Sequence, residues 1–249
     1  MVHEIEYRIV GDDMQAVVII LDQNETVRAE AGAMMYMDQG IEMETSTGGG
    51  LWKGLKRKLS GESFFITTYT CRVKRAEVAF AAPYPGHITP LDLAQTGPVL
   101  CQRDSYLCSA HGIDVTVAFT RRLGAGFFGG EGFVLQRLEG DAGLAFIHAG
   151  GTVIERTLAP GQTLKVDTGC LVGFQESVEY DVALAAGVKT MLFGGEGLFL
   201  ATLTGPGKIW LQTLPFSRLA NRIYAAAGGG REETKKGFSL GGLISGDNE

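Results

Sequence analysis

One acidic residue recurs three times in the sequence, each time after a glycine and just before an apolar segment. Glu62, Glu131 and Glu196 are separated by 69 and 65 positions. Carboxylates in equivalent places could bind a metal ion or carry out acid–base chemistry. Alternatively, each glutamate accepts hydrogen bonds from backbone N–H groups at a glycine turn. Since no second acid, histidine or nucleophile recurs beside them, the pattern favours a structural role and leaves a metal-dependent enzyme or metal-binding protein as the alternative.

A second recurring feature is a group of cations next to bulky apolar side chains, just ahead of each Gly-Glu pair. These residues are Trp52, Lys53, Lys56, Arg57 and Lys58, then Arg121, Arg122, Phe127 and Phe128, then Lys189 and Phe193. In the first copy, Leu51, Leu55 and Leu59 have the spacing of one helix face. A rim of such loops predicts contact with an anionic membrane surface or an acidic protein partner. The alternative is that the apolar side chains pack between subunits and the cations are only solvated.

Composition and charge exclude several functions. The chain has 249 residues, a formal net charge of −6 and a pI near 5.3, which argues against binding RNA or DNA. No apolar window is long enough to span a bilayer, and the N-terminal residues lack the pattern of a secretory signal, so we expect a cytoplasmic protein. The four cysteines and four histidines show no ligand spacing, so the sequence predicts free thiols and no cofactor.

The motifs keep a common register along the chain. The segment from Leu21 to Glu44 aligns without a gap onto Leu158 to Asp181, at an offset of 137. A smaller offset of 65 carries Leu93 onto Leu158 and also Glu131 onto Glu196. We therefore expect three tandem units at 1–72, 73–140 and 141–215, followed by a helix and a mobile tail at 216–249.

Short β-branched and alternating segments predict strands in every unit. They lie at 14–21, 41–45, 64–69, 115–119 and 198–203. Hairpin turns are expected at 22–25 and 159–162, and Gly32 and Gly169 are expected where a positive φ or a close backbone approach requires glycine. Ser217 is the expected N-cap of the C-terminal helix. Tyr84 and His87 lie in a proline-rich segment that predicts a rigid hairpin loop, with a pocket as the alternative.

Several motifs together resemble a known family. They are Gly61-Glu-Ser-Phe-Phe, Gly130-Glu-Gly-Phe-Val-Leu, Gly195-Glu-Gly-Leu-Phe-Leu and Gln212-Thr-Leu-Pro-Phe-Ser. With them the chain resembles the bacterial proteins grouped with the mitochondrial biogenesis (altered inheritance of mitochondria) proteins. The resemblance implies an all-β fold of three units similar to the tryptophan RNA-binding attenuation protein (TRAP), each a short double-stranded β-helix type sandwich, in a pseudo-threefold arrangement. It also implies a homotrimer with a ring of nine units, and no assigned catalytic residues.

These observations favour one class of function. We expect a non-enzymatic, homo-oligomeric scaffold or binding protein, a trimeric ring associated with a membrane surface through its rim loops. RNA and tryptophan binding are not expected, because the cations do not recur as a repeated basic edge. The competing expectation is metal-dependent chemistry at the repeated glutamates.

Overall fold

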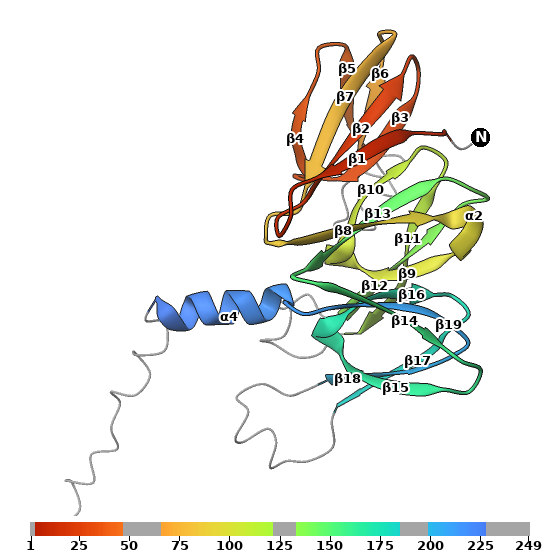
Figure 1. Cartoon of the computed structure of the whole chain (residues 1–249), viewed down its shortest axis with the longest axis vertical. Coiled ribbons are helices and arrows are strands. Elements are labelled where there is room, and N and C mark those ends of the chain that lie inside the picture. The colour runs from red at the N-terminus through yellow and green to blue at the C-terminus, as the bar shows by residue number, and fades with distance from the viewer. Residues whose placement is uncertain (1–2, 47–65, 122–132, 185–198, 228–249) are drawn as a thin grey trace, which may run out of the picture.

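The chain folds into antiparallel strands that form four sheets. The computed structural model describes residues 3–46, 66–121, 133–184 and 199–227. The sheets follow one another along the longest axis, and the first and the fourth lie at opposite ends (Figure 1). The prediction of an all-β protein with a C-terminal helix is therefore confirmed, and the pseudo-threefold arrangement of three units stays a prediction.

Two sheets lie at the N-terminal end of the stack. The first sheet contains, in spatial order, β1 (Glu6–Val10), β2 (Ala16–Asp22), β7 (Arg75–Ala81) and β4 (Met34–Met37). The second contains β5 (Ile41–Ser46), β6 (Ile66–Cys71), β3 (Thr26–Glu30), β10 (Tyr106–Ala110), β13 (Leu144–Gly150) and β8 (Gly86–Asp92).

The other two sheets complete the stack. The third contains β11 (Asp114–Arg121), β12 (Phe133–Glu139), β9 (Val99–Gln102), β16 (Leu171–Gln175), β19 (Gly207–Gln212) and β14 (Val153–Leu158). The fourth contains β15 (Thr163–Asp167), β18 (Phe199–Thr204) and β17 (Glu179–Leu184). The helical elements are α2 (Leu93–Thr96), η1 (Arg103–Ser105), η3 (Thr168–Cys170) and α4 (Phe216–Ala226).

After β1, the strands come in three consecutive sets of six: β2–β7, β8–β13 and β14–β19. In each set the first, sixth and third strands pair in one sheet, and the second, fifth and fourth strands pair in the next. The boundaries expected after 72 and 140 fall before β7 and β13, the sixth strands, which return to pair with β2 and β8. The descent of the sets from a TRAP-like unit stays a prediction.

Successive sets are connected by strand pairing, and we call each connection a joint. At the first joint β3 pairs with β10, and at the second β9 pairs with β16. Both joints therefore unite the second strand of one set with the third strand of the following set. Because the paired strands belong to one continuous sheet, neighbouring sets share backbone hydrogen bonds as well as side-chain packing.

Apolar side chains of the strands form two buried clusters. The larger contains residues of the first two sets, among them Phe80 and Phe146, and extends to Trp210 of the third. The smaller lies mainly in the third set, where it includes Leu203, and extends to Phe133 of the second. The four cysteines are free thiols, three of them buried, as the sequence predicts.

Most predicted turns are confirmed. Asn24 has a φ of 69° in the turn between β2 and β3, and Gly161 has a φ of 73° in the turn after β14. Gly32 has the expected positive φ of 92°. Gly169 lies instead inside η3, and a Cβ there would lie 3.4 Å from Asp167 Oδ1. Because 3.4 Å is an ordinary van der Waals distance and the φ of Gly169 is not positive, neither expected reason for glycine applies at 169, and this part of the prediction is wrong.

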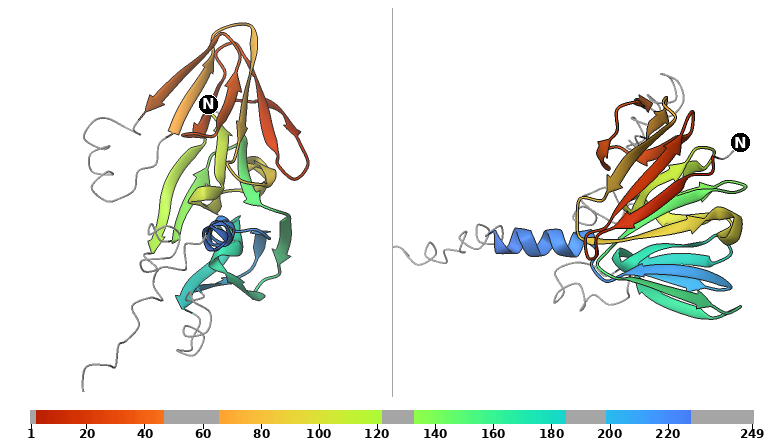
Figure 2. Two further views of the ribbon diagram at one scale, coloured as in Figure 1. Left: turned by 90° about the vertical axis from the view of Figure 1, so that its left-hand side faces the viewer. Right: turned by 45° about the horizontal axis from the view of Figure 1, so that its top comes forward.

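Helix α4 projects from the body of the molecule (Figures 1 and 2). None of its residues is buried. The expected N-cap at Ser217 is wrong, because the helix begins at Phe216 and Pro215 occupies the N-cap position. No side chain caps the helix, and the carbonyl oxygen of Pro215 accepts hydrogen bonds from Arg218 N and Leu219 N. Arg218 Nη2 binds Asp167 Oδ2 at 2.6 Å and ties this turn to the third set.

Candidate functional site

The site residues expected from the sequence lie almost entirely outside the described ranges. These include the three glutamates, Glu62, Glu131 and Glu196, and the rim residues Trp52, Lys53, Lys56, Arg57, Lys58, Arg122, Phe127, Phe128, Lys189 and Phe193. Arg121 is the last residue of β11. The rim and the glutamate site therefore stay predictions. Among the described residues, the candidate site lies at a joint between strand sets.

A cavity of about 270 Å³ lies at the first joint. Glu30, at the end of β3, and Asp104, in η1, contribute carboxyl groups to its lining. His148 of β13 and Tyr106 of β10 add an imidazole and a phenol. The first and second strand sets thus meet around a small space with four polar side chains, a position where proteins commonly bind small molecules.

Burial and nearby charge shift the ionisation of two of these groups. Burial raises the pKa of Glu30 to about 7, and the neighbouring Asp104 adds to the increase while Arg103 opposes it. Burial also lowers the pKa of His148 to about 4, with a smaller effect of His87. His148 is only 2% exposed, and its Nδ1 has no hydrogen-bond partner. Near neutral pH the cavity therefore holds a neutral imidazole and a carboxyl group that is partly protonated.

The second joint has different side chains in the same topological positions. Gln102 ends β9 as Glu30 ends β3, and its Nε2 donates to the carbonyl oxygen of Thr168. Gln212 corresponds to His148, and its Nε2 donates to Gly169 O at 2.8 Å while its Oε1 accepts from Gly150 N at 2.8 Å. Neutral amides thus connect the two sets, where the first joint has ionisable groups and a cavity.

This site is not marked by any sequence motif. Glu30 aligns with Asp167 in the sequence comparison, but no motif marks it as different from other strand ends. The proline-rich segment with Tyr84 and His87 predicts a rigid hairpin loop, with a pocket as the alternative, but His87 lies in β8, where it pairs with Ala149 of β13. The structure places them beside the joint: His87 Nδ1 lies 2.6 Å from Gly151 O, and the Tyr84 ring contacts the His148 ring edge-on at 4.7 Å.

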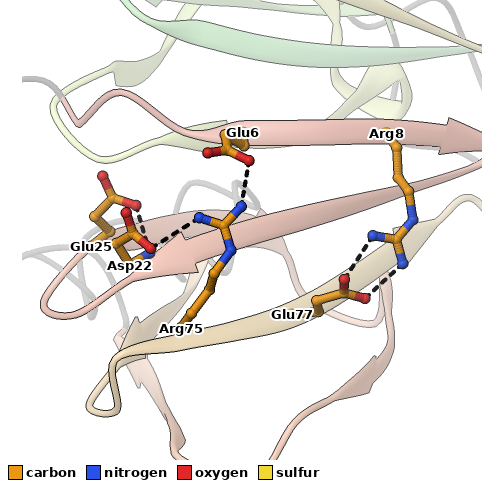
Figure 3. A network of polar contacts seen from close by, with 6 residues as sticks. All are labelled: Glu6, Arg8, Asp22, Glu25, Arg75 and Glu77. Carbon is orange, nitrogen blue, oxygen red and sulfur yellow. Dashed lines mark hydrogen bonds and ion pairs between the residues drawn. The ribbon is translucent and has the colours of Figure 1, made fainter.

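A network of ion pairs covers the outer face of the first sheet (Figure 3). Arg8 of β1 donates two hydrogen bonds of 2.7 Å to the carboxylate of Glu77 on β7. Arg75 binds both Glu6, at 2.5 Å, and Asp22, at 3.2 Å. The hydrogen bonds from Arg8 lower the pKa of Glu77. The network links the three neighbouring strands β1, β2 and β7 at the end of the stack.

Neither a group of metal ligands nor a membrane-spanning helix is found among the described residues. In these ranges, no three His, Cys, Asp or Glu side chains are grouped so that they could hold a metal ion. None of the described helices is long and apolar enough to cross a bilayer.

Comparison with known proteins decides the family. The model of the mitochondrial biogenesis AIM24 family matches residues 7–214. The chain belongs to the AIM24 family. One relative, an uncharacterised protein of Streptococcus pyogenes serotype M6, is 26% identical over 214 residues, which is 83% of this chain and 84% of the relative.

The AIM24 fold is also found among solved structures. The crystal structure of a Streptococcus pyogenes protein matches with a TM-score of 0.74 and 24% identity, over 90% of this chain and 100% of that chain. At this identity the likeness shows the fold alone. The family description and the relative's name state no enzymatic activity, so the chain is an AIM24 protein of unknown biochemical function.

Proposed function

We propose that this AIM24 protein is a non-enzymatic, homo-oligomeric scaffold of the cytoplasm. The observation that carries the proposal is an exposed apolar strand at one end of the stack. Met35 and Tyr36 of β4 are 57% and 45% exposed, and Met37 beside them is also exposed. Unpaired apolar edges promote association of chains unless charge or proline protects them, and β4 contains neither.

The oligomer is proposed as a trimer, on the strength of the family resemblance and the open ends of the stack. Light scattering on the purified chain across a range of concentrations tests this directly. We expect three times the mass of 26.6 kDa. A mass equal to one chain at every concentration would remove the basis of the scaffold function.

Contact with an anionic membrane surface through the rim residues is a further part of this proposal. Vesicles with and without anionic lipid, sedimented with the protein, provide the test. We expect sedimentation that depends on anionic lipid and is lost when Lys53, Lys56, Arg57 and Lys58 are changed to Glu. Equal recovery in the supernatant with both vesicle types would contradict membrane contact and would support packing of the loops between subunits.

A further inference from the structure

The two joints are built from the same positions of the strand sets. At the first joint the opposed residues are Val27 and Ala110, Arg28 and Ser109, and Ala29 and Cys108. At the second they are Val99 and Gln175, Leu100 and Phe174, and Cys101 and Gly173. In both joints, the next-to-last residue of the second strand, Ala29 or Cys101, lies opposite the third-strand residue that directly follows a β-bulge, Cys108 or Gly173.

That bulge occurs at one place in every third strand. The register of pairing with the sixth strand shifts between Met34 and Tyr36 in β4, between Tyr106 and Cys108 in β10, and between Leu171 and Gly173 in β16. Bulges fix the register of a strand and the direction of its side chains. The bulge therefore identifies corresponding residues in the three third strands, including the one that is not part of a joint.

One second strand and one third strand are left without this partner. Among the described residues, β15 pairs only with β18, and β4 pairs only with β7. The corresponding strands inside joints are largely or completely buried, as β3, β9, β10 and β16 show. In contrast, β4 is mostly exposed and β15 is partly exposed. Among the described strands, the sheet at one end of the stack thus has a third strand, β4, without a second-strand partner. The sheet at the other end has a second strand, β15, without a third-strand partner (Figure 1).

We propose that β15 of one copy of the chain pairs antiparallel with β4 of the next copy, and so forms a third joint. The register of the two internal joints places Val166 opposite Tyr36, Lys165 opposite Met37 and Leu164 opposite Asp38. This inference rests on the proposed homo-oligomer and specifies its interface.

The partner of each edge is a second copy because both internal joints pair a second strand with a third strand, and the two ends of the chain carry one strand of each kind. Pairing of two different edges, β15 with β4, is a heterologous contact. Such contacts close into a ring when the rotation between copies permits, and otherwise they extend into a filament. Burial of Met35, Tyr36 and Met37 would remove the exposed apolar strand from water. The joint would also continue the fourth sheet of one copy into the first sheet of the next.

Disulfide trapping tests the register. Opposed residues of antiparallel strands have Cα atoms about 4.5–5.5 Å apart, which suits a disulfide. The variant carries Tyr36→Cys and Val166→Cys, with Cys170→Ala to remove the half-exposed native thiol. The matched control carries Tyr36→Cys and Lys165→Cys, since a shift of one residue turns the side chain to the other face of the sheet. We expect mild oxidation to link most chains of the variant covalently and few chains of the control.

A charge exchange tests the same register without cysteine. Met37→Lys would place two lysines opposite each other and should weaken association about fivefold or more at each interface. Adding Lys165→Glu should restore association, because the opposed residues then have opposite charges. Dissociation constants from light scattering or sedimentation give the readout, and the melting temperature of dilute protein verifies that the variants fold.

The outcomes separate the inference from the proposed function. Covalent linkage of the variant together with rescue by Lys165→Glu supports the joint. Oligomers that neither crosslink at 36 and 166 nor respond to the exchange overturn the joint but leave the homo-oligomeric scaffold intact. A chain that is monomeric at every concentration overturns both. Equal crosslinking of variant and control overturns the register.

Discussion

Glu30 is a residue whose ionisation should make the stability of the fold depend on pH. Its pKa is raised to about 7 in the folded chain, from the ordinary value of 4.5, because burial disfavours the carboxylate. The protonated form therefore stabilises the fold fully at low pH, and this contribution is lost as the pH rises through about 7. We predict that the free energy of unfolding, relative to Glu30→Gln, falls by about 2–3 kcal/mol between about pH 5 and pH 8.

Urea unfolding of the wild type and Glu30→Gln at several pH values measures this difference, at fixed protein concentration. Asp104→Asn is the companion variant, because Asp104 is the second cause of the raised pKa of Glu30. Asp104→Asn should make the decrease in unfolding free energy between pH 5 and pH 8 smaller without abolishing it. Parallel pH profiles for the wild type and Glu30→Gln would show that Glu30 ionises in the folded chain as it does in the unfolded one.

Gln102 at the second joint offers the reverse substitution. Gln102→Glu replaces a buried N–H donor, which binds Thr168 O, with an acceptor or a charge. We predict a loss of about 2–4 kcal/mol of unfolding free energy above neutral pH and a smaller loss at pH 5, where the carboxyl group can be protonated. Gln102→Met, of similar shape, is the control and should cost less than Glu at high pH. Equal losses for the two variants would contradict the role assigned to the amide.

Strands were predictable from the sequence where one short segment carries the signal. The pattern at 14–21 locates β2 (Ala16–Asp22), and that at 198–203 locates β18 (Phe199–Thr204), each within two residues. The joints were not predictable, because β3 and β10 pair across about 80 residues and no local pattern specifies which edges meet. The cavity was not predictable for the same reason, since Glu30, Asp104 and His148 come together only when the joint forms.

Helix α4 is the element least tied to the rest of the fold. Its links to the strands include the ion pair between Arg218 and Asp167 and the contact between the Phe216 and Tyr84 rings, whose centroids are 5.2 Å apart. We predict that a chain ending at Phe216 melts within about 3 °C of a chain ending at Ala227, because an exposed ion pair contributes little. Differential scanning calorimetry makes the comparison. A much larger decrease would show that α4 packs against a surface, such as a neighbouring copy, that is lacking in the single chain.

At the scale of the whole molecule, the strand sets depend on one another. Repeat proteins gain stability from intrinsic and interfacial terms, and here the interfaces are continuous sheets. The larger apolar cluster contains Phe80 of the first set, Phe146 of the second and Trp210 of the third. A set removed from its neighbours would expose part of this cluster and lose a row of backbone hydrogen bonds. The chain should therefore unfold as one cooperative unit rather than set by set.

Phe80→Ala tests this cooperativity from one end of the chain to the other. Phe80 is fully buried in β7, so the substitution should cost about 3–5 kcal/mol. In a Trp52→Phe background, Trp210 is the only tryptophan and reports on the third set. We predict that Trp210 fluorescence and far-ultraviolet circular dichroism shift together to lower urea concentration, with coincident transitions. Leu203→Ala in β18, within the smaller cluster, should shift both signals in the same way. If Phe80→Ala instead lowers the urea midpoint of the dichroism transition but not that of the Trp210 fluorescence transition, the third set unfolds independently. The shared sheets would then not couple the two ends of the chain.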